Sequence, residues 1–322
     1  MLPQGFTRVE WIQSNGTQRV NTGIVGRAGI EAEVEFAFTA VPSGAVTILG
    51  AFQSTTRIYL PHYSNTFYLG YGAAKNTGKA ASAGTMYNII TSLNTGAQTM
   101  RINGELVYSG TDATTYTTTL NMYLFSLNRD GTSMYPASIK LSKCRISYNS
   151  AKVRDYIPFI DESGDANLWD EISLTPAEKV GTFVAGPAII PGAPANLTQS
   201  ADGTAVTLTW DAVEYANHYK ILRDGIELAD ISGDIFAYID TTAEAGTKHT
   251  YKVIACNGVQ DGGASTVEVQ LALLLPQILA AIMSPNPTTI NSKITITVRV
   301  DEIEIIPQPV WYYSGEIYAG EV

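Results

Sequence analysis

The sequence has few of the residues from which disulfide scaffolds and metal sites are built. Its 322 residues include two cysteines and three histidines. Cys144 and Cys256 are far apart and fall in segments that we assign to different domains, so we expect buried free thiols rather than a disulfide framework. This cysteine usage is typical of a protein that folds in a reducing cytoplasm, including one that later works outside the cell as part of a particle.

The N-terminal sequence also lacks the features of a secretory signal peptide. Residues 1–11, MLPQGFTRVEW, contain neither a basic region nor an apolar core. The one long apolar run, Leu271–Met283, contains Pro276 and Gln277 and is too short to cross a bilayer. If the protein acts outside a cell, we expect release by lysis or by dedicated machinery rather than by signal-dependent secretion.

Charged residues are scarce and unevenly distributed. They make up 16% of the chain, and the formal net charge is −10. Residues 1–186 carry 14 basic and 14 acidic residues, whereas residues 187–322 carry 6 basic and 16 acidic residues. An acidic chain without a basic stripe argues against nucleic acid as a partner. We interpret the acidic half as a soluble surface.

Residues 1–186 lack a sustained helical period and instead predict many short strands. Ile30–Phe38 alternates three glutamates with apolar residues. Asn103-Gly104 predicts a two-residue hairpin turn because both residues tolerate positive φ. About a dozen strands at this spacing predict a two-sheet sandwich of the jelly-roll type. The other expected strands include Ala45–Phe52, Arg57–Leu60, Thr66–Tyr71, Tyr87–Leu93, Gln98–Ile102, Glu105–Ser109, Leu120–Leu127 and Ser138–Tyr148.

The two ends of this region carry its most specific pattern. The first end is GFTRVEWIQSNGTQRVNTGI, in which Trp11 is expected to be structural because tryptophan has a large apolar area. The second end contains Arg154-Asp155-Tyr156-Ile157-Pro158, Leu168-Trp169-Asp170 and Gly181-Thr182-Phe183. With these motifs, residues 1–186 resemble the concanavalin A-like, laminin-G-like jelly-roll modules of phage and gut-bacterial surface proteins. The resemblance implies that the first and last strands pair and close the sandwich.

A second pattern begins after a short Pro/Gly linker, PAIIPGAP, at residues 187–194. Val206, Leu208 and Trp210 alternate on one face of an expected strand, and Tyr251 follows Ala-Gly-Thr-Lys-His-Thr. Residues 195–275 resemble a fibronectin type III domain, in which Trp210 and Tyr251 would be structural, the latter as the tyrosine-corner residue. Such domains act as spacers or as platforms for other proteins.

Residues 276–322 predict a third, small β unit. Residues 294–300 alternate apolar and polar side chains, and residues 301–306 are the expected return strand. The sequence ends in a repeat, YSGEI followed by YAGEV, which resembles endings of phage tail-fibre and baseplate-region proteins. This unit is either a segment that docks to the particle by adding a strand to a partner's sheet or an ordinary small β-domain. In the first case we expect docking through Trp311, Tyr313 and Tyr318.

The candidate catalytic motifs are weak. Glu31, Glu33 and Glu35 place three carboxylates on one face of a strand, as some jelly-roll glucanases do. The glucanase pattern, Glu-x-Asp-x-x-Glu with a bulge, is absent, so we interpret these glutamates as solvent-facing. The histidines have no metal-ligand spacing, and the sequence has no Gly-x-Ser-x-Gly elbow or nucleophilic Cys/His pair. We therefore expect no enzymatic activity and no cofactor.

The remaining signals indicate binding. Lectin-like sandwiches stack an aromatic ring on a sugar and bind its hydroxyl groups with Asn and Asp side chains. Arg57–Tyr71 is rich in aromatic residues, although half of such a segment is usually core. Asn128 and Asp130 lie in a polar loop that could bind Ca²⁺ or a hydroxyl group, or could be a plain Asp-Gly turn. The candidate carbohydrate-binding residues are Tyr59, His62, Tyr63, Tyr68, Tyr71, Asn128 and Asp130.

These features predict an all-β protein with a jelly-roll at 1–186, a linker at 187–194, a fibronectin type III domain at 195–275 and an attachment unit at 276–322. The resemblances imply a phage or phage-tail-like virion protein that presents a lectin-like domain to a host-surface glycan or protein. It would be assembled in the host cytoplasm, dock to virion proteins through its C-terminal unit and form a homo-oligomer, first of all a trimer, without membrane insertion. The alternatives are a capsid decoration or collar protein and a cell-wall polysaccharide hydrolase.

Overall fold

A computed structural model describes residues 2–202, 205–272, 278–284, 295–300 and 303–305, with side chains up to residue 272. Every regular element in these ranges is a β-strand, as the alternating sequence pattern predicts. No helix in the described ranges has the length and apolarity needed to span a membrane.

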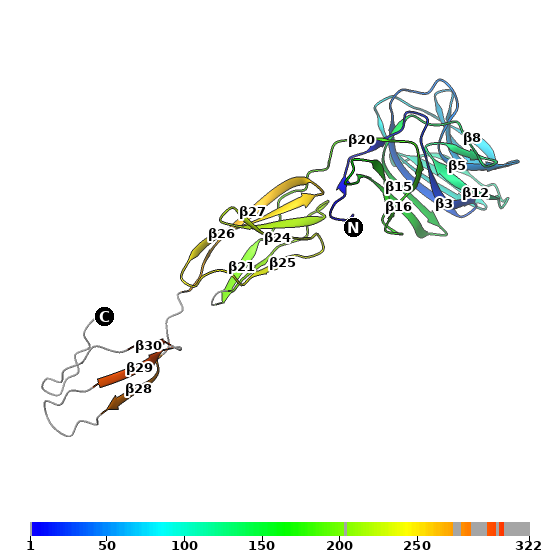
Figure 1. Ribbon diagram of the computed structural model, residues 1–322. Coiled ribbons are helices and arrows are strands. Elements are labelled where there is room, and N and C mark those ends of the chain that lie inside the picture. The colour runs from blue at the N-terminus through cyan, green and yellow to red at the C-terminus, as the bar shows by residue number, and fades with distance from the viewer. Residues whose placement is uncertain (1, 203–204, 273–277, 285–294, 301–302, 306–322) are drawn as a thin grey trace. The chain divides into compact units, whose positions relative to one another are not determined.

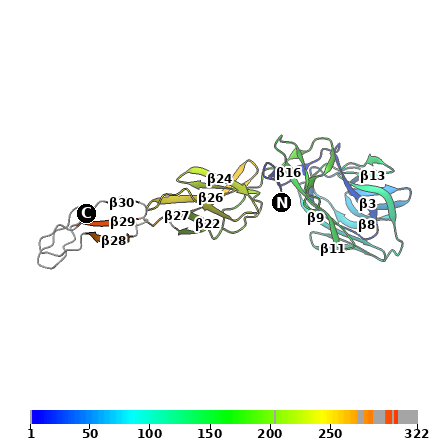
Figure 2. The same cartoon turned by 60° about the horizontal axis from the view of Figure 1, so that its bottom comes forward.

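The jelly-roll consists of two mainly antiparallel sheets, which we call the β4 sheet and the β6 sheet (Figures 1 and 2). The β4 sheet runs in the order β11 (Glu105–Gly110), β10 (Ala97–Ile102), β9 (Met86–Asn94), β4 (Ile30–Phe38), β15 (Ile139–Tyr148), β16 (Ala151–Ile160), β17 (Ala166–Asp170) and β18 (Thr175–Pro176), joined by β1 (Thr7–Arg8), β2 (Ile12–Gln13) and β20 (Val184–Ala185). The β6 sheet runs in the order β19 (Glu178–Val180), β3 (Arg19–Arg27), β12 (Thr117–Leu124), β5 (Val46–Gln53), β6 (Thr56–Tyr63), β7 (Thr66–Tyr71) and β8 (Ala73–Ala80), joined by β13 (Leu127–Arg129) and β14 (Thr132–Met134).

The period-2 pattern of each strand decides which side chains form the core between the sheets. On β4, Ile30, Val34 and Phe36 are buried, while the glutamates between them lie on the outer face. Rings from both sheets meet in this core: the centroids of Phe36 and Phe67 lie 6.3 Å apart, and those of Phe38 and Phe67 lie 6.0 Å apart. Burying each such side chain contributes roughly 1.5–3 kcal/mol, so the alternation fixes the register of the strands that face the core on one side.

The first and last strands of the jelly-roll are paired, as the resemblance of the two ends implies. Thr7 on β1 pairs with Ile160 on β16. Ile12 on β2 pairs with Ala185 on β20, and β3 pairs with β19. Trp11 is half-buried in this closure, with Lys140 Nζ 4.0 Å from its ring centroid. The sandwich is therefore closed by strands from opposite ends of one module.

In the described residues of the fibronectin-like region, seven strands form sheets of three and four, the division found in seven-stranded Ig-type sandwiches. Trp210 packs edge to face on Tyr219, with ring centroids 5.4 Å apart, and Tyr251 is fully buried. The strands are β21 (Thr198–Asp202), β22 (Ala205–Thr209) and β25 (Ala237–Asp240) in one sheet, and β24 (Ile226–Ser232), β23 (His218–Arg223), β26 (Lys248–Asn257) and β27 (Gln260–Gln270) in the other.

A small antiparallel sheet lies in the C-terminal region. It contains β28 (Ile278–Ser284), β29 (Thr295–Val300) and β30 (Ile303–Ile305). Val298 pairs with Ile305, so the expected return strand after residues 294–300 is confirmed. The exact domain boundaries at residues 186, 194 and 275 stay predictions.

Candidate functional site

The outer face of the β6 sheet carries the aromatic residues that the sequence indicates for binding. Along β6, Ile58, Leu60 and His62 are buried, whereas Arg57, Tyr59 and Tyr63 point to the other face. The alternation of a strand places residues two apart on the same face. Tyr59 and Tyr63, separated by Pro61, therefore share one surface with Arg57.

A cleft of about 350 Å³ opens on this face, and we call it the tyrosine cleft. Its lining is mainly aromatic and apolar, with two arginines. The residues that carry the argument below are Phe52 on β5, Arg57, Tyr59 and Tyr63 on β6, Tyr68 on β7, Arg129 on β13, and Tyr135 after β14.

Two glycines make room for the ring of Tyr59. Gly50 on β5 and Gly70 on β7 are its cross-strand partners on either side. A Cβ atom at Gly70 would overlap the Tyr59 ring, and one at Gly50 would overlap the Tyr59 Cβ atom. The Tyr59 ring can lie over Gly70, with the Tyr59 Cβ atom close to Gly50, only because both neighbours lack side chains. Burial raises the pKa of Tyr59, and the nearby Arg57 opposes that shift, so the phenol stays neutral at physiological pH.

Three residues in a row across three strands form one end of the cleft. Phe52 pairs with Arg57 on its antiparallel neighbour β6 and with Arg129 on its parallel neighbour β13. The guanidinium carbons of Arg57 and Arg129 lie 4.8 and 5.0 Å from the centroid of the Phe52 ring. Cation–π contacts of this kind hold an arginine in place without using its N–H donors.

Tyrosines form the rim of the cleft. Tyr63 is 55% exposed, and its ring centroid lies 6.4 Å from that of Tyr68. Asn76 on β8 donates a 3.2 Å hydrogen bond from Nδ2 to the Tyr68 hydroxyl group. Tyr135 has φ of 52°, a left-handed conformation that is rare for an aromatic residue, and its carbonyl accepts a 2.8 Å bond from the Thr47 N–H. Strained residues of this type are concentrated at binding sites.

Two of the sequence-predicted residues are part of the core instead of the cleft. His62 is fully buried and packs against Phe38 in a tilted contact and against Phe67 edge to face, with ring centroids 4.9 and 5.3 Å away. Tyr71 is 1% exposed and donates its hydroxyl proton to the Thr114 carbonyl at 2.7 Å. Both side chains lie at alternate positions of their strands that face the core. The prediction that they line a binding surface together with Tyr59 is therefore wrong.

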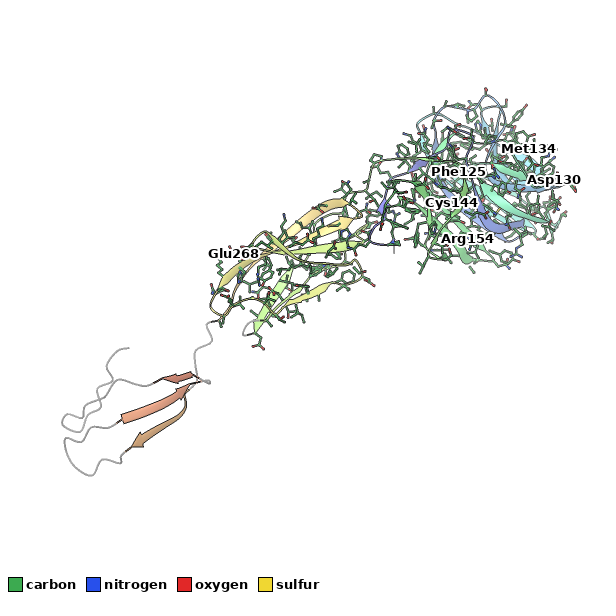
Figure 3. The ribbon with its side chains drawn as sticks, in the orientation of Figure 1. Phe125, Asp130, Met134, Cys144, Arg154 and Glu268 are labelled. Atoms are coloured by element: carbon green, nitrogen blue, oxygen red, sulfur yellow. The ribbon has the colours of Figure 1, made fainter. Side chains whose placement is uncertain are left out.

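Asn128 and Asp130 belong to a hairpin turn. Asp130 and Gly131 have φ of 48° and 87° and connect β13 to β14, which is the plain Asp-Gly turn considered above. Asn128 is buried, donates to the Asn121 carbonyl and accepts from the Gly131 N–H. Its side chain is thus not available to a ligand. Asp130 is exposed at the margin of the jelly-roll (Figure 3) and accepts a 3.2 Å bond from the Ser54 N–H.

The outer face of the β4 sheet holds the three glutamates of the glucanase-like motif. Glu33 accepts bonds from Lys143 Nζ at 3.1 Å and Arg145 Nη1 at 2.9 Å. Burial alone would raise the pKa of Glu33, but hydrogen bonds from Lys143 and Asn88 and the charges of Lys143 and Arg145 lower it overall. Because a general acid needs a raised pKa, this carboxylate is poorly suited to that role.

Two buried carboxylates lie next to this group. Asp155 is paired with Lys152 at 2.7 Å and with Arg145 at 3.3 Å. Asp170, 2% exposed, accepts from the N–H groups of Asp155 and Ile172 at 3.0 and 3.1 Å and from the Ser173 hydroxyl group at 2.8 Å. These contacts tie β15, β16 and β17 together, so their evident role is structural.

Thiols and metal ligands offer no further chemistry in the described residues. Cys144 and Cys256 are free and buried, as expected from their positions in the sequence. Burial raises the pKa of Cys256 to about 12 and raises that of Cys144 as well, so neither is a thiolate near neutral pH. Among the described residues, no cluster of three or more His, Cys, Asp or Glu side chains is arranged to hold a metal ion. Trp311, Tyr313 and Tyr318 lie outside the described residues.

Sequence comparison gives one informative match. No protein-family model matches the chain. A stretch of 87 residues is 33% identical to a tail tube protein of Bacillus phage SPP1 and covers 27% of this chain. The chain spans only about a third of that relative, since the match covers 32% of it.

Structural comparison finds β-rich proteins at low sequence identity. A candidate carbohydrate-binding protein of Bacteroides ovatus has 11% identity and a TM-score of 0.44, covering 56% of this chain and 61% of that protein. Domains LG4-5 of the mouse laminin α1 chain have 12% identity and a TM-score of 0.34, covering 92% and 76%. A mutant fibronectin type III domain has 22% identity and a TM-score of 0.24, covering 26% and 97%.

Proposed function

We propose that this protein is a structural component of a phage or phage-tail-like virion, and that its jelly-roll binds a host-surface glycan in the tyrosine cleft without catalysing a reaction. The observation that carries the glycan part is Tyr59, which pairs with Gly50 and Gly70 on either side and whose ring lies over Gly70 in the lining of the cleft. A flat, half-buried ring is the surface on which a sugar stacks, and about 350 Å³ falls within the range of small-ligand sites.

The virion part is supported by the sequence match to a phage tail tube protein. In this proposal residues 276–322 attach the protein to other virion proteins, with Trp311, Tyr313 and Tyr318 as docking residues. Several copies, in a trimer as the first expectation, present their clefts together. The affinity of each single cleft for the glycan can then be low. Once one cleft is bound, the linked clefts experience a high effective concentration of glycan, which raises the overall affinity.

The absence of catalysis is supported by the pairing of Glu33. A retaining glycosidase needs one carboxylate that carries a proton near neutral pH and a second that is free to attack the sugar. Glu33 is ion-paired with two cations and has a lowered pKa. Release of reducing ends from wall polysaccharide by the purified protein would favour the hydrolase alternative. Antibody labelling of the head of intact particles would favour a decoration protein.

The test uses the full-length protein, coupled at high density to beads and exposed to a glycan array and to cell-wall polysaccharides of Gram-positive bacteria. We expect wild-type binding and a loss of about tenfold or more for Tyr59→Ala, since each 1.4 kcal/mol of lost contact is tenfold in affinity. Tyr63→Ala, at an exposed position that the fold does not need, should weaken binding by a smaller factor.

Tyr215→Ala is the matched control, because Tyr215 is a partly exposed tyrosine in the fibronectin-like region and should leave binding unchanged. Wild-type protein that binds no glycan, or Tyr59→Ala protein that binds as tightly as the wild type, contradicts the proposed glycan site.

A further inference from the structure

The charge of the tyrosine cleft is positive and unbalanced. Among the described residues that line it, two are arginines and none is a carboxylate. Within the described part of the chain, neither Arg57 nor Arg129 has an acidic oxygen within 4 Å. On the β4 sheet, by contrast, Arg145 is paired with both Glu33 and Asp155.

The two guanidinium groups are held in place by cation–π contacts with one aromatic ring. Each stacks on Phe52, one from β6 and one from β13, and the contact uses ring faces instead of N–H donors. Arg129 shares one N–H with the Tyr135 hydroxyl group at 3.5 Å. Since an arginine has five N–H donors, most of those in this pair remain for a ligand. Fixing the side chains beforehand also reduces the entropy lost on binding.

The arginines are placed at a suitable distance from the aromatic floor. Arg57 and Tyr59 are two residues apart on the same face of β6, which corresponds to about 6.5 Å along a strand. That separation is similar to the length of one sugar ring. A ring stacked on Tyr59 would therefore place a substituent at the guanidinium groups.

We propose that the cleft is selective for anionic saccharides: a carboxylate or phosphate group on the glycan binds Arg57 and Arg129 while the sugar ring rests on Tyr59. This selectivity rests on the glycan-binding function proposed above. Carboxylate and phosphate groups share the geometry that matters here, because both accept paired N–H bonds from a guanidinium group.

The experiment measures binding of the full chain to matched pairs of oligosaccharides. One member of each pair is neutral, and the other carries a uronic acid carboxylate in one arm or a phosphate in the other. We expect the anionic member to bind at least about tenfold more tightly, and Arg57→Gln and Arg129→Gln to lose about 10- to 100-fold for that member alone. The arm with the larger preference identifies which anion the site takes.

Arg101→Gln is the matched control. Arg101 is an exposed arginine on β10 in the other sheet, where it bonds to the Gly104 carbonyl, and the variant removes the same unit of charge. It should leave the preference unchanged. Arg57→Lys keeps the charge but loses the planar fork, so it should recover only part of the affinity.

Three results would overturn the proposal. The first is equal affinity for neutral and anionic ligands in both arms. The second is an anion preference that survives both glutamine variants. The third is an equal loss for Arg101→Gln, which would indicate a non-specific charge effect. If anion selectivity fails while Tyr59→Ala still abolishes binding, the glycan function stands without it. If Tyr59→Ala changes nothing, the proposed function itself fails.

Discussion

The two sheets of the jelly-roll use polar side chains in different ways. On the outer face of the β4 sheet, Glu33 and Asp155 are paired with lysine and arginine. On the core-facing side of the same sheet, the buried Asp170 lies opposite Tyr156 and accepts three hydrogen bonds. On the outer face of the β6 sheet, Arg57 and Arg129 stack on an aromatic ring beside a cleft. The polar groups of the β4 sheet are paired within the protein, whereas the two arginines of the β6 sheet keep unused N–H donors. This difference separates residues that hold strands together from residues that are free to hold a ligand.

Removing Asp170 should have the largest effect on stability. In Asp170→Ala the buried N–H group of Asp155 and the part-buried N–H group of Ile172 lose their acceptor, and an unsatisfied buried group costs about 1–3 kcal/mol. We expect the free energy of unfolding to fall by about 3 kcal/mol in urea denaturation. Asp130→Asn removes an exposed charge at the margin of the β6 sheet but keeps an oxygen acceptor for the Ser54 N–H and tolerates the left-handed φ of 48°, so it should cost less than about 0.5 kcal/mol. Equal losses for the two variants would remove the distinction between the two sheets.

Gly70→Ala should distort the cleft by displacing the Tyr59 ring that lies over Gly70. The new methyl group would overlap the Tyr59 ring, and overpacking typically costs about 1–3 kcal/mol. We expect a stability loss of about 2 kcal/mol by thermal unfolding, together with loss of glycan binding, because the ring must move. Gly44→Ala is the control, since a Cβ atom there meets no neighbour and the φ angle is not left-handed. Full binding by Gly70→Ala protein would mean that the position of Tyr59 is unimportant.

Glu33→Gln should have a small and pH-dependent effect. The pKa of Glu33 in the folded protein is below its ordinary value of 4.5, so its contribution is fully present above pH 4.5 and is lost as the pH falls through the folded-state pKa. At pH 7 we expect the variant to be less stable by about 1 kcal/mol, and at pH 3 the difference should shrink. Glycan binding should be unchanged at pH 7. A stability difference that grows on acidification contradicts the assigned ion pairs.

Much of the jelly-roll is readable from the sequence because its strands alternate clearly. The expected segments Ile30–Phe38 and Thr66–Tyr71 match β4 and β7, and Asn103-Gly104 forms the predicted turn with φ of 50° and 84°. The strand β8 was missed because its sequence, AAKNTGKA, has no large apolar residue with which to mark a buried face. The position of such an edge strand is determined by its hydrogen bonds to the neighbouring strand. The amino-acid composition of the segment does not reveal that pairing.

The site was only partly predictable for a similar reason. Parity along β6 separates Tyr59 and Tyr63 from His62, and applying it strictly would have removed His62 from the candidates. The row formed by Arg57, Phe52 and Arg129 carries no such signal. It depends on a parallel pairing between β5 and β13, which are separated by many intervening strands in the sequence. Non-local pairings of this kind leave no periodic trace in either segment.

The pairing of β1, β2 and β3 with β16, β20 and β19 has a consequence for evolution. The polypeptide enters and leaves this module at the same margin of the sandwich, so another module with adjacent ends fits the same junction. Recombination at that junction would exchange the whole jelly-roll in one step and leave the downstream sequence unchanged. Under the function proposed above, exchange of this module would change the ligand that the protein binds without a series of substitutions around Tyr59.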